Sequence, residues 1–420
     1  MSKILYYTKS LCPVCFKEIY AQIIVENNKI YMVKECREHG SYKTLTWDDT
    51  EENYFKWLSY GGLEVEKLPK SEIEVDNIMK GGFESIVDNP SQPVSAALMT
   101  TSLCNAKCPV CFTRDSNRYL PSIEECKAQL EKYKEFAGEG SPLEFCGGEP
   151  TVRKDLCELA TIARDMGFNY IQLNTNGFKI AQNLDYAIKL KESGITTIYL
   201  GYDGDNEESY ITKYGENVLP LKYKAVENAK KAGLAVVLVP CLIPGSNDDR
   251  LKDIIDFAKK NIPTVKGVYI QPVSYFGSYP KDYKKIRLTI PQVLRKLEEQ
   301  TNGEIKKVDF MPGGCEHPQC SFNAYYMLDK KGVLRAFTQF KQIKKTNVES
   351  VRNNAKKIWS PSMNHGLSIG GMAFMDVWNI DLLRVKKCTV QIITKDYKTV
   401  SLCAKYITSE DGSMFIPGIN

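Results

Sequence analysis

Three cysteines between residues 104 and 111 have the spacing of an iron–sulfur loop. Cys104, Cys108 and Cys111 form a CxxxCxxC array directly after a predicted strand. Three thiolates on one short loop bind three irons of a cubane and leave the fourth iron without a protein ligand. An open metal position accepts a substrate or cofactor, whereas a metal saturated by protein ligands is structural. A structural cluster or a zinc loop that takes its fourth ligand from elsewhere is the alternative.

A glycine-rich segment follows the next predicted strand. Gly147 and Gly148 precede Glu149 and Pro150. Adjacent glycines let backbone groups approach a ligand closely, and Glu149 can accept a hydrogen bond from an amine. Asn-Gly and Asp-Gly pairs at later strand ends also form ordinary turns, and the sixth strand end also fits simple packing. Polar candidates at the ends of the third, fourth and sixth predicted strands are Asn174, Thr175, Asn176, Asp203 and Gln271.

The cysteine loop, with Phe112 beside its third cysteine, and the GGEP segment together resemble the radical S-adenosylmethionine (SAM) superfamily. The resemblance covers about residues 94–275. It implies a [4Fe–4S] cluster on Cys104, Cys108 and Cys111, with SAM bound at the open iron. It also implies reductive cleavage of SAM to a 5′-deoxyadenosyl radical that abstracts hydrogen from an unactivated carbon. The residues that it places against SAM are Phe112, Gly147, Gly148, Glu149, Pro150, Asn174, Thr175, Asn176, Asp203 and Gln271.

Two further groups of cysteines flank this region. Near the N-terminus a CxxC…CxxH array is typical of a tetrahedral metal ion, and both zinc and a mononuclear rubredoxin-like iron fit it. Because four ligands saturate the ion, we expect a structural role. Beyond residue 310 four thiolates equal the ligand count of a closed auxiliary [4Fe–4S] cluster, although two of them could be ordinary buried cysteines. The two ligand sets are Cys12, Cys15, Cys36 and His39, and Cys315, Cys320, Cys388 and Cys403.

A narrower resemblance spans most of the chain. The N-terminal CPVC…CREHG unit, the segment that starts at Gln271, the CxHPxC element and the closing cysteines resemble the archaeal tetraether synthase group, which has relatives once described as pterin methyltransferases. This resemblance implies C–C bond formation on a lipid chain. One alternative is a radical SAM methyltransferase or modifier of a small heterocycle or peptide. An alternative of another class is a non-catalytic iron–sulfur electron-transfer protein.

The elements that must position these residues alternate regularly from residue 94. Alternating strand and helix patterns favour parallel βα units, and in a parallel barrel functional groups gather after the carboxyl ends of the strands. We therefore expect an α/β fold, a partial (β/α)6 TIM-like barrel with a small N-terminal metal-binding ribbon and a C-terminal auxiliary iron–sulfur module. The predicted strands are 94–101, 143–146, 170–174, 197–202, 235–241 and 267–273, and the predicted helices are 123–136, 153–166, 180–193, 220–232 and 249–260.

Four segments follow from these patterns. We expect a zinc-ribbon or rubredoxin-like module at residues 1–50, a linker or packing segment at 51–93, the barrel at 94–310 and an auxiliary-cluster domain at 311–420. A hairpin turn is predicted at Glu26-Asn27-Asn28. The boundary before the barrel is placed in the breaker-rich segment 88–93.

Composition limits the partners and the compartment. The formal net charge of +5 over 420 residues does not argue for nucleic acid, although a mildly basic surface leaves transient membrane contact open. No secretory segment is visible, and the longest apolar run, 234–244, is about half the length of a membrane-spanning helix. Fourteen cysteines without such a segment favour metal ligation in a reducing, anaerobic cytoplasm. The expected partners are SAM, a lipid or other small-molecule substrate, and a low-potential electron donor such as ferredoxin or flavodoxin.

Overall fold

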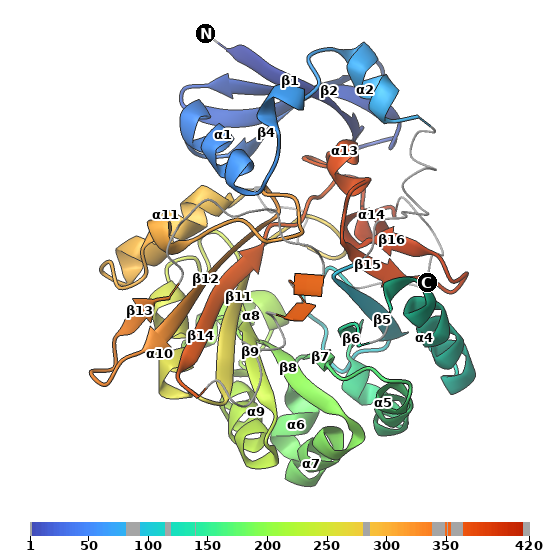
Figure 1. Cartoon of the computed structure of the whole chain (residues 1–420), viewed down its shortest axis with the longest axis vertical. Helices are drawn as coiled ribbons and strands as arrows, with labels where there is room; N and C mark the ends of the chain where they lie inside the picture. The colour runs from blue at the N-terminus through green and yellow to red at the C-terminus, as the bar shows by residue number, and fades with distance from the viewer. Residues whose placement is uncertain are drawn as a thin grey trace.

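A small antiparallel sheet and a large, mostly parallel sheet organise the chain (Figure 1). In the figure the small sheet lies at one end of the molecule, above the fanned strands of the large one. The computed structural model describes residues 2–80, 93–113, 119–138, 140–279, 286–337, 349–350, 352–353 and 364–414.

The N-terminal sheet has its strands in sequence order, each antiparallel to the next. Between the second and third strands, Asn27 and Asn28 have φ angles of 50° and 57°. Positive φ at both central residues is the geometry of a two-residue turn that matches strand twist, so the predicted hairpin is confirmed. Two helices occupy the segment expected to be a linker. The elements are β1 (Lys3–Leu11), β2 (Glu18–Glu26), β3 (Lys29–Cys36), β4 (Gly40–Trp47), α1 (Glu51–Tyr60), η1 (Val65–Lys67) and α2 (Glu72–Ile78).

The six predicted barrel strands are present, with ends that differ by no more than about two residues. They lie side by side in chain order and pair in parallel. The fifth is interrupted at Pro240, which has no N–H to donate, and continues as a short strand. The strands are β5 (Ser95–Thr101), β6 (Leu143–Gly147), β7 (Ile171–Thr175), β8 (Ile195–Gly201), β9 (Ala235–Val239), β10 (Cys241–Leu242) and β11 (Val265–Pro272).

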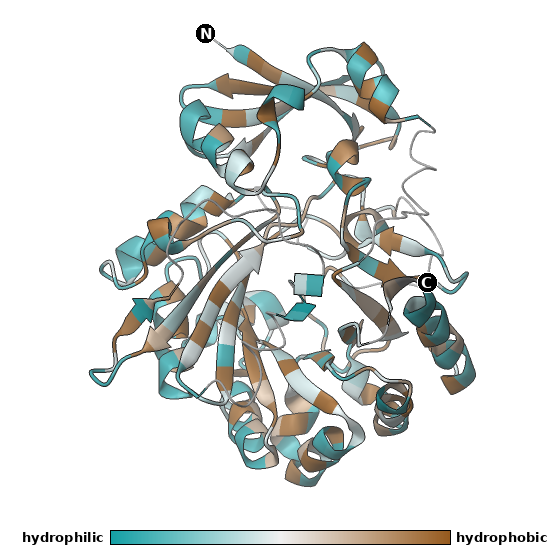
Figure 2. Cartoon of the chain, viewed as in Figure 1, coloured by the Kyte–Doolittle hydropathy of each residue, from teal (hydrophilic) through white to brown (hydrophobic). Residues whose placement is uncertain are grey.

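Helices cover the outer face of this sheet, and Figure 2 shows hydrophobic residues concentrated on the strands, with hydrophilic ones on the exposed sides of the helices. The predicted helix at 180–193 is divided at Asn183, whose side chain accepts from Tyr186 N at 2.9 Å and so begins a new helix. Helix α8 (Glu207–Tyr214) was not predicted. The other helices are α4 (Ile123–Ala137), α5 (Leu156–Asp165), α6 (Phe178–Gln182), α7 (Leu184–Ser193), α9 (Leu219–Ala232), α10 (Leu251–Lys260) and α11 (Ile290–Gln300).

Strands from beyond residue 311 extend the large sheet at both edges. Strand β14 (Gly366–Met372) pairs in parallel with β11, and β15 (Val390–Ile393) pairs in parallel with β5. Antiparallel strands then continue each edge. The four-segment division of the chain stays a prediction, and most of its 88–93 boundary lies outside the described residues. The remaining elements are β12 (Ser321–Leu328), β13 (Leu334–Ala336), α13 (Leu382–Val385), β16 (Thr399–Ser401) and α14 (Leu402–Tyr406).

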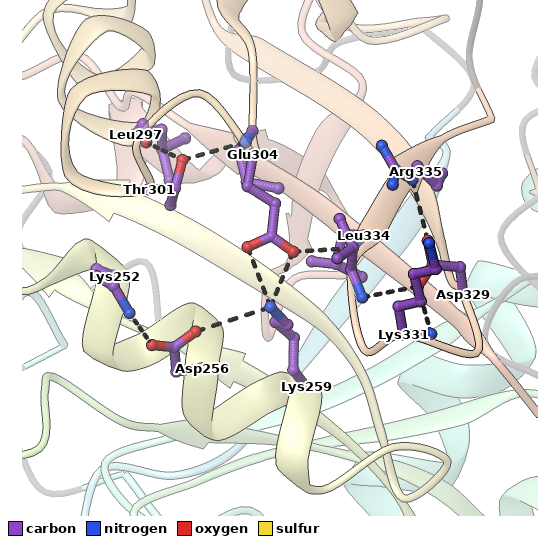
Figure 3. Close-up of polar contacts among 12 residues, drawn as sticks. Lys252, Asp256, Lys259, Leu297, Thr301, Glu304, Asp329, Lys331, Leu334 and Arg335 are labelled. Atoms are coloured by element: carbon purple, nitrogen blue, oxygen red, sulfur yellow. Dashed lines mark hydrogen bonds and ion pairs between the residues drawn. The ribbon is translucent and has the colours of Figure 1, made fainter.

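One edge hairpin is attached to the barrel helices by the polar contacts drawn in Figure 3. Glu304 accepts hydrogen bonds from Lys259 of α10 at 2.8 and 3.0 Å. The same carboxylate accepts from the backbone N of Leu334, in β13, at 2.8 Å. Asp329 accepts from the backbone N of Lys331 and from Arg335, and this stabilises the turn between β12 and β13.

The N-terminal sheet shares a hydrophobic core with the barrel. Tyr6 and Trp47 belong to the same buried cluster as Leu98 and Phe145 of the first two barrel strands. No helix in the described ranges combines the length and the apolar character needed to cross a membrane.

Candidate functional site

The three cysteines of the CxxxCxxC array lie on the loop that follows β5. Cys104 is exposed, while Cys108 and Cys111 are half-buried. Burial raises the pKa of Cys108 to about 11, and the charges of Cys111 and Cys104 add to the increase. All three sulfurs belong to one short loop, as a three-ligand cluster site requires. Their donor set therefore fits the iron–sulfur site predicted for it, and cluster binding would release the thiol protons.

Gly147 and Gly148 hold this loop against the sheet. A Cβ on Gly147 would lie 2.1 Å from the carbonyl oxygen of Thr101, and one on Gly148 would lie 2.4 Å from that of Leu103. The backbone N of Gly148 donates to Thr101 O, and that of Glu149 donates to Leu103 O, both at 2.8 Å. Glycine is thus required here by close approach to the cysteine loop, a structural reason that the sequence did not reveal. Contact of these glycines with SAM stays a prediction.

Glu149 joins the loops that follow β6 and β7. Its carboxylate is 1% exposed and accepts from the backbone N and hydroxyl of Thr151, the hydroxyl of Thr175 and the backbone N of Asn176. Asn176 in turn donates from Nδ2 to Asn105 Oδ1 at 2.7 Å, within the cysteine loop. Pro150 begins the short helix η2 (Pro150–Val152) that carries Thr151. The structure therefore brings three predicted site segments together.

Three other residues predicted to contact SAM have different surroundings. Asn174 lies on the strand itself, where its Nδ2 is 3.4 Å from Glu144 Oε2. Gln271 is half-buried at the end of β11, and its backbone N donates to Pro240 O at 2.9 Å. Phe112 packs edge-on against Phe276 and Tyr406, with ring centroids 5.9 and 5.4 Å apart. The contacts of Asn174, Gln271 and Phe112 with SAM stay predictions.

Asp203 is fully buried after β8. Its Oδ1 accepts from the backbone N of Cys241 at 2.8 Å and from Lys213 Nζ at 2.9 Å. Its Oδ2 has no hydrogen-bond partner among the described residues. A buried, orphaned carboxylate oxygen beside the cysteine loop fits a cofactor that offers an amine or hydroxyl. Gly215 ends helix α8, which carries Lys213, and a Cβ on Gly215 would lie 3.7 Å from Cδ of Pro109 in the cysteine loop, so α8 packs beside this loop.

Sequence reasoning missed both lysines near this loop, Lys213 and Lys222. Lys213 lies in α8, whose polar residues give a weak helical pattern, and Asn206, which caps the helix, was the available signal. Lys222 is fully buried in α9, with its Nζ 2.8 Å from Asn176 O and 2.9 Å from the hydroxyl oxygen of Tyr214. Helix α9 contains several lysines, and those near Lys222 in the sequence are exposed. The sequence of the helix therefore gives no sign that Lys222 is the buried one.

The pKa of Lys222 predicts a specific pH dependence of stability. Burial lowers this pKa to about 7, whereas the unfolded side chain has its ordinary value near 10.5. Between these values the unfolded chain binds a proton that the folded chain does not, so the free energy of unfolding should rise with pH. Denaturant unfolding at pH 7 and pH 9 should show this rise in the wild type and a smaller rise in Lys222→Met. Equal rises in the two proteins would contradict the assignment.

The four predicted N-terminal ligands lie together in the structure. Ligand atoms of Cys12, Cys15, Cys36 and His39 all lie within 4.8 Å of one another. His39 Nδ1 is 3.6 Å from the sulfur of Cys12 and 3.5 Å from that of Cys36. A backbone hydrogen bond from Glu38 and the side chain of His39 lower the pKa of Cys36 to about 6, so its thiolate is available at neutral pH. Three sulfurs and one nitrogen fit a structural zinc or iron ion.

Cobalt distinguishes this site from a chance cluster of cysteines. Full-length protein loaded with Co²⁺ should show the ligand-field absorption of a tetrahedral thiolate-rich site, because the four donors are already assembled. Cys15→Ala should lose most of this absorption, whereas Cys157→Ala, in helix α5, should keep it. Identical spectra for the wild type and Cys15→Ala would disprove the ligand assignment.

The structure brings three of the four late cysteines together. Cys320, Cys388 and Cys403 line one cavity beneath the ends of β14 and β15, together with Glu316 and His317. Arg384 Nη2 donates to the sulfur of Cys320 at 2.9 Å. Cys315 is not among the residues that line this cavity. The auxiliary cluster and its fourth ligand therefore stay predictions.

Comparisons with known proteins agree on two regions of the chain. A family model described as the radical SAM superfamily matches residues 98–258, and one described as the HMPTM N-terminal zinc ribbon domain matches residues 4–48. The 7,8-dihydro-6-hydroxymethylpterin dimethyltransferase of Methanocaldococcus jannaschii is 34% identical, covering 94% of this chain and 92% of its own length. A GTP 3′,8-cyclase of Nautilia profundicola is 28% identical over 43% of this chain and 56% of its own. Streptococcus suis SuiB, solved with its precursor peptide SuiA, shares 16% identity over 72% of this chain and 69% of its own, with a TM-score of 0.43.

Proposed function

This chain belongs to the radical SAM superfamily, and from that premise we propose that it is a radical SAM methyltransferase that modifies a pterin-like heterocycle. As a member it is an enzyme that uses a [4Fe–4S] cluster and SAM as co-substrate. The observation that carries the finer proposal is the 34% identity, over nearly the whole length of both chains, to a 7,8-dihydro-6-hydroxymethylpterin dimethyltransferase. This relative favours the methyltransferase alternative over C–C coupling on a lipid chain, which the sequence led us to expect first.

Different residues at the carboxyl ends of the barrel strands would bind the cluster, bind SAM and hold the cysteine loop in place. The cluster, when bound, supplies the electron that cleaves SAM. We propose that Cys104, Cys108 and Cys111 hold the cluster and that the orphaned Oδ2 of Asp203 accepts a hydrogen bond from SAM. The Glu149 network would keep the loop that carries these cysteines in place against β6 and β7. A ferredoxin or flavodoxin remains the proposed electron donor.

We also propose that Cys320, Cys388 and Cys403 bind an auxiliary cluster. The support is their shared cavity and the guanidinium of Arg384, which would stabilise a thiolate at Cys320. Burial lowers the pKa of His317 well below its ordinary value, so this imidazole is neutral beside the three cysteines. Cys315, predicted as the fourth ligand, lies five residues before Cys320 on the same loop.

An assay with labelled SAM tests the proposed reaction. Anaerobically reconstituted protein would be given dithionite, methyl-labelled SAM and 7,8-dihydro-6-hydroxymethylpterin. We expect label in the pterin, together with 5′-deoxyadenosine, by chromatography and mass spectrometry. A preparation in which pterin stays unlabelled, while lipid extract stimulates 5′-deoxyadenosine formation and yields coupled chains, would favour lipid coupling instead.

A further inference from the structure

A second cavity lies where the N-terminal sheet covers the carboxyl ends of two parallel barrel strands. Its walls come from Trp47 at the end of β4, from residues 272–274 after β11 and from residues 373–375 after β14. Residues 287–290, Gln319 and Arg384 are also among the residues that line it. The ends of parallel strands are where barrel enzymes place their ligands. This cavity shares Ala373, Phe374, Met375 and Arg384 with the neighbouring cysteine cavity but has no cysteine among its lining residues.

Three residues of its wall each carry a polar atom that lacks a hydrogen-bond partner within the described part of the chain. These atoms are the indole Nε1 of Trp47, the amide Oε1 of Gln319 and the Nε of Arg384. The three residues are buried, with exposures of 2%, 6% and 9%. Leaving buried polar atoms unpaired is unfavourable, and native proteins rarely do so. Two donors and one acceptor on residues that line one cavity therefore favour a ligand with complementary groups.

The charges on the wall narrow the class of ligand. Arg287 is already engaged, because its two terminal nitrogens each lie 2.9 Å from Asp376. Arg384 uses one terminal nitrogen on Cys320, which leaves its Nε for a ligand. No carboxylate is among the residues that line the cavity, so an acceptor group is favoured there. A carbonyl oxygen with an adjacent N–H would satisfy both donors and the Gln319 oxygen.

The cavity also lies next to the cysteine loop. The ring of Phe374, on the cavity wall, is 6.4 Å from the ring of Phe112. Phe112 directly follows Cys111, and the backbone of Cys111 pairs with Ser278 just beyond β11. A ligand in this cavity would be separated from the cluster loop by a single aromatic layer.

We infer that this cavity binds the lactam edge, a ring carbonyl beside a ring N–H, of the heterocyclic substrate. Trp47 and Arg384 would donate to the carbonyl oxygen, and Gln319 would accept from the N–H. The N-terminal ribbon is then part of the substrate site, since Trp47 closes the ribbon's last strand. This inference rests on the proposed function for its choice of heterocycle.

Binding measurements on the full-length reconstituted protein test the site without turnover. The probes are 2-amino-4-oxopteridine, which has the lactam edge, and 2,4-diaminopteridine, in which an amino group replaces the carbonyl. Trp47→Phe keeps an aromatic ring and removes the donor, and Gln319→Met keeps the length of the side chain and removes the acceptor. Thr46→Val is the matched control, because Thr46 lies on the same wall but its hydroxyl already donates to Ile30 O at 3.1 Å.

We expect calorimetry to show binding of the oxopteridine to the wild type and to Thr46→Val. Each of the other two variants should bind about tenfold more weakly, the effect of one lost hydrogen bond, and so should the diamino compound to the wild type. Equal affinities for all four proteins, or no binding to a wild type that holds its cluster, would overturn the inference. If the protein transfers methyl groups but Trp47→Phe binds the oxopteridine as tightly as the wild type, the inferred substrate site is wrong and the proposed function stands. If oxopteridine binding depends on Trp47 but no methyl transfer is detected, the binding site stands and the proposed function is wrong.

Discussion

Cys108→Ala is expected to abolish SAM cleavage. Cys108 is the middle of the three predicted ligands, and without it only two thiolates would remain for a cluster that needs three to leave a single iron open. Burial raises the pKa of the free Cys108 thiol to about 11, so without metal this thiol would stay protonated at neutral pH. Anaerobic incubation with SAM and dithionite, followed by chromatography, should show no 5′-deoxyadenosine from the variant.

The matched control is Cys157→Ala. Cys157 is half-buried in α5, outside the cysteine loop, and we expect its variant to retain both iron content and product formation. Electron paramagnetic resonance of the reduced proteins would report the cluster independently of turnover. Wild-type signal and product in Cys108→Ala would mean that the loop does not hold the catalytic cluster.

Glu149→Ala is expected to destabilise the protein by about 3 kcal/mol or more and to stop SAM cleavage. The change leaves two backbone N–H groups and two hydroxyls without their acceptor, all close to a carboxylate that is 1% exposed. The loops after β6 and β7 would then lose the group that joins them. Anaerobic denaturant unfolding measures the change in stability, and Glu158→Ala, at an exposed position in α5, should shift it by less than about 0.5 kcal/mol.

Glu149→Gln separates a structural role from contact with SAM. The amide keeps one acceptor oxygen and the shape of the side chain, so stability should recover in part. If Glu149 also accepts from the amine of SAM, as the superfamily resemblance implies, the affinity for SAM should remain reduced after the fold is restored. Recovery of stability and of SAM affinity together would show that the residue acts only through the loops.

Local patterns were sufficient for the parts of the site whose residues are close in sequence. The CxxxCxxC loop and the two knuckles of the N-terminal site bring their ligands together over a few residues, so spacing alone specifies the donor set. The regular βα alternation likewise predicted the six central strands, because hydrophobic periodicity reflects which face of each element is buried. Helix α8 was missed because its sequence is largely polar.

The sequence by itself therefore determined the superfamily and the parallel barrel, and it predicted the cluster loop and the ribbon's metal ligands. Only the tertiary structure decided which distant segments meet. It placed β14 and β15 on opposite sides of the six barrel strands, buried Lys222 against the backbone of Asn176, and assembled Cys320 with Cys388 and Cys403. It also formed a cavity lined by Trp47, Gln319 and Arg384, although Trp47 is more than 200 residues away from the other two in the sequence. Such contacts depend on how whole elements pack, and no local spacing or periodicity encodes that packing.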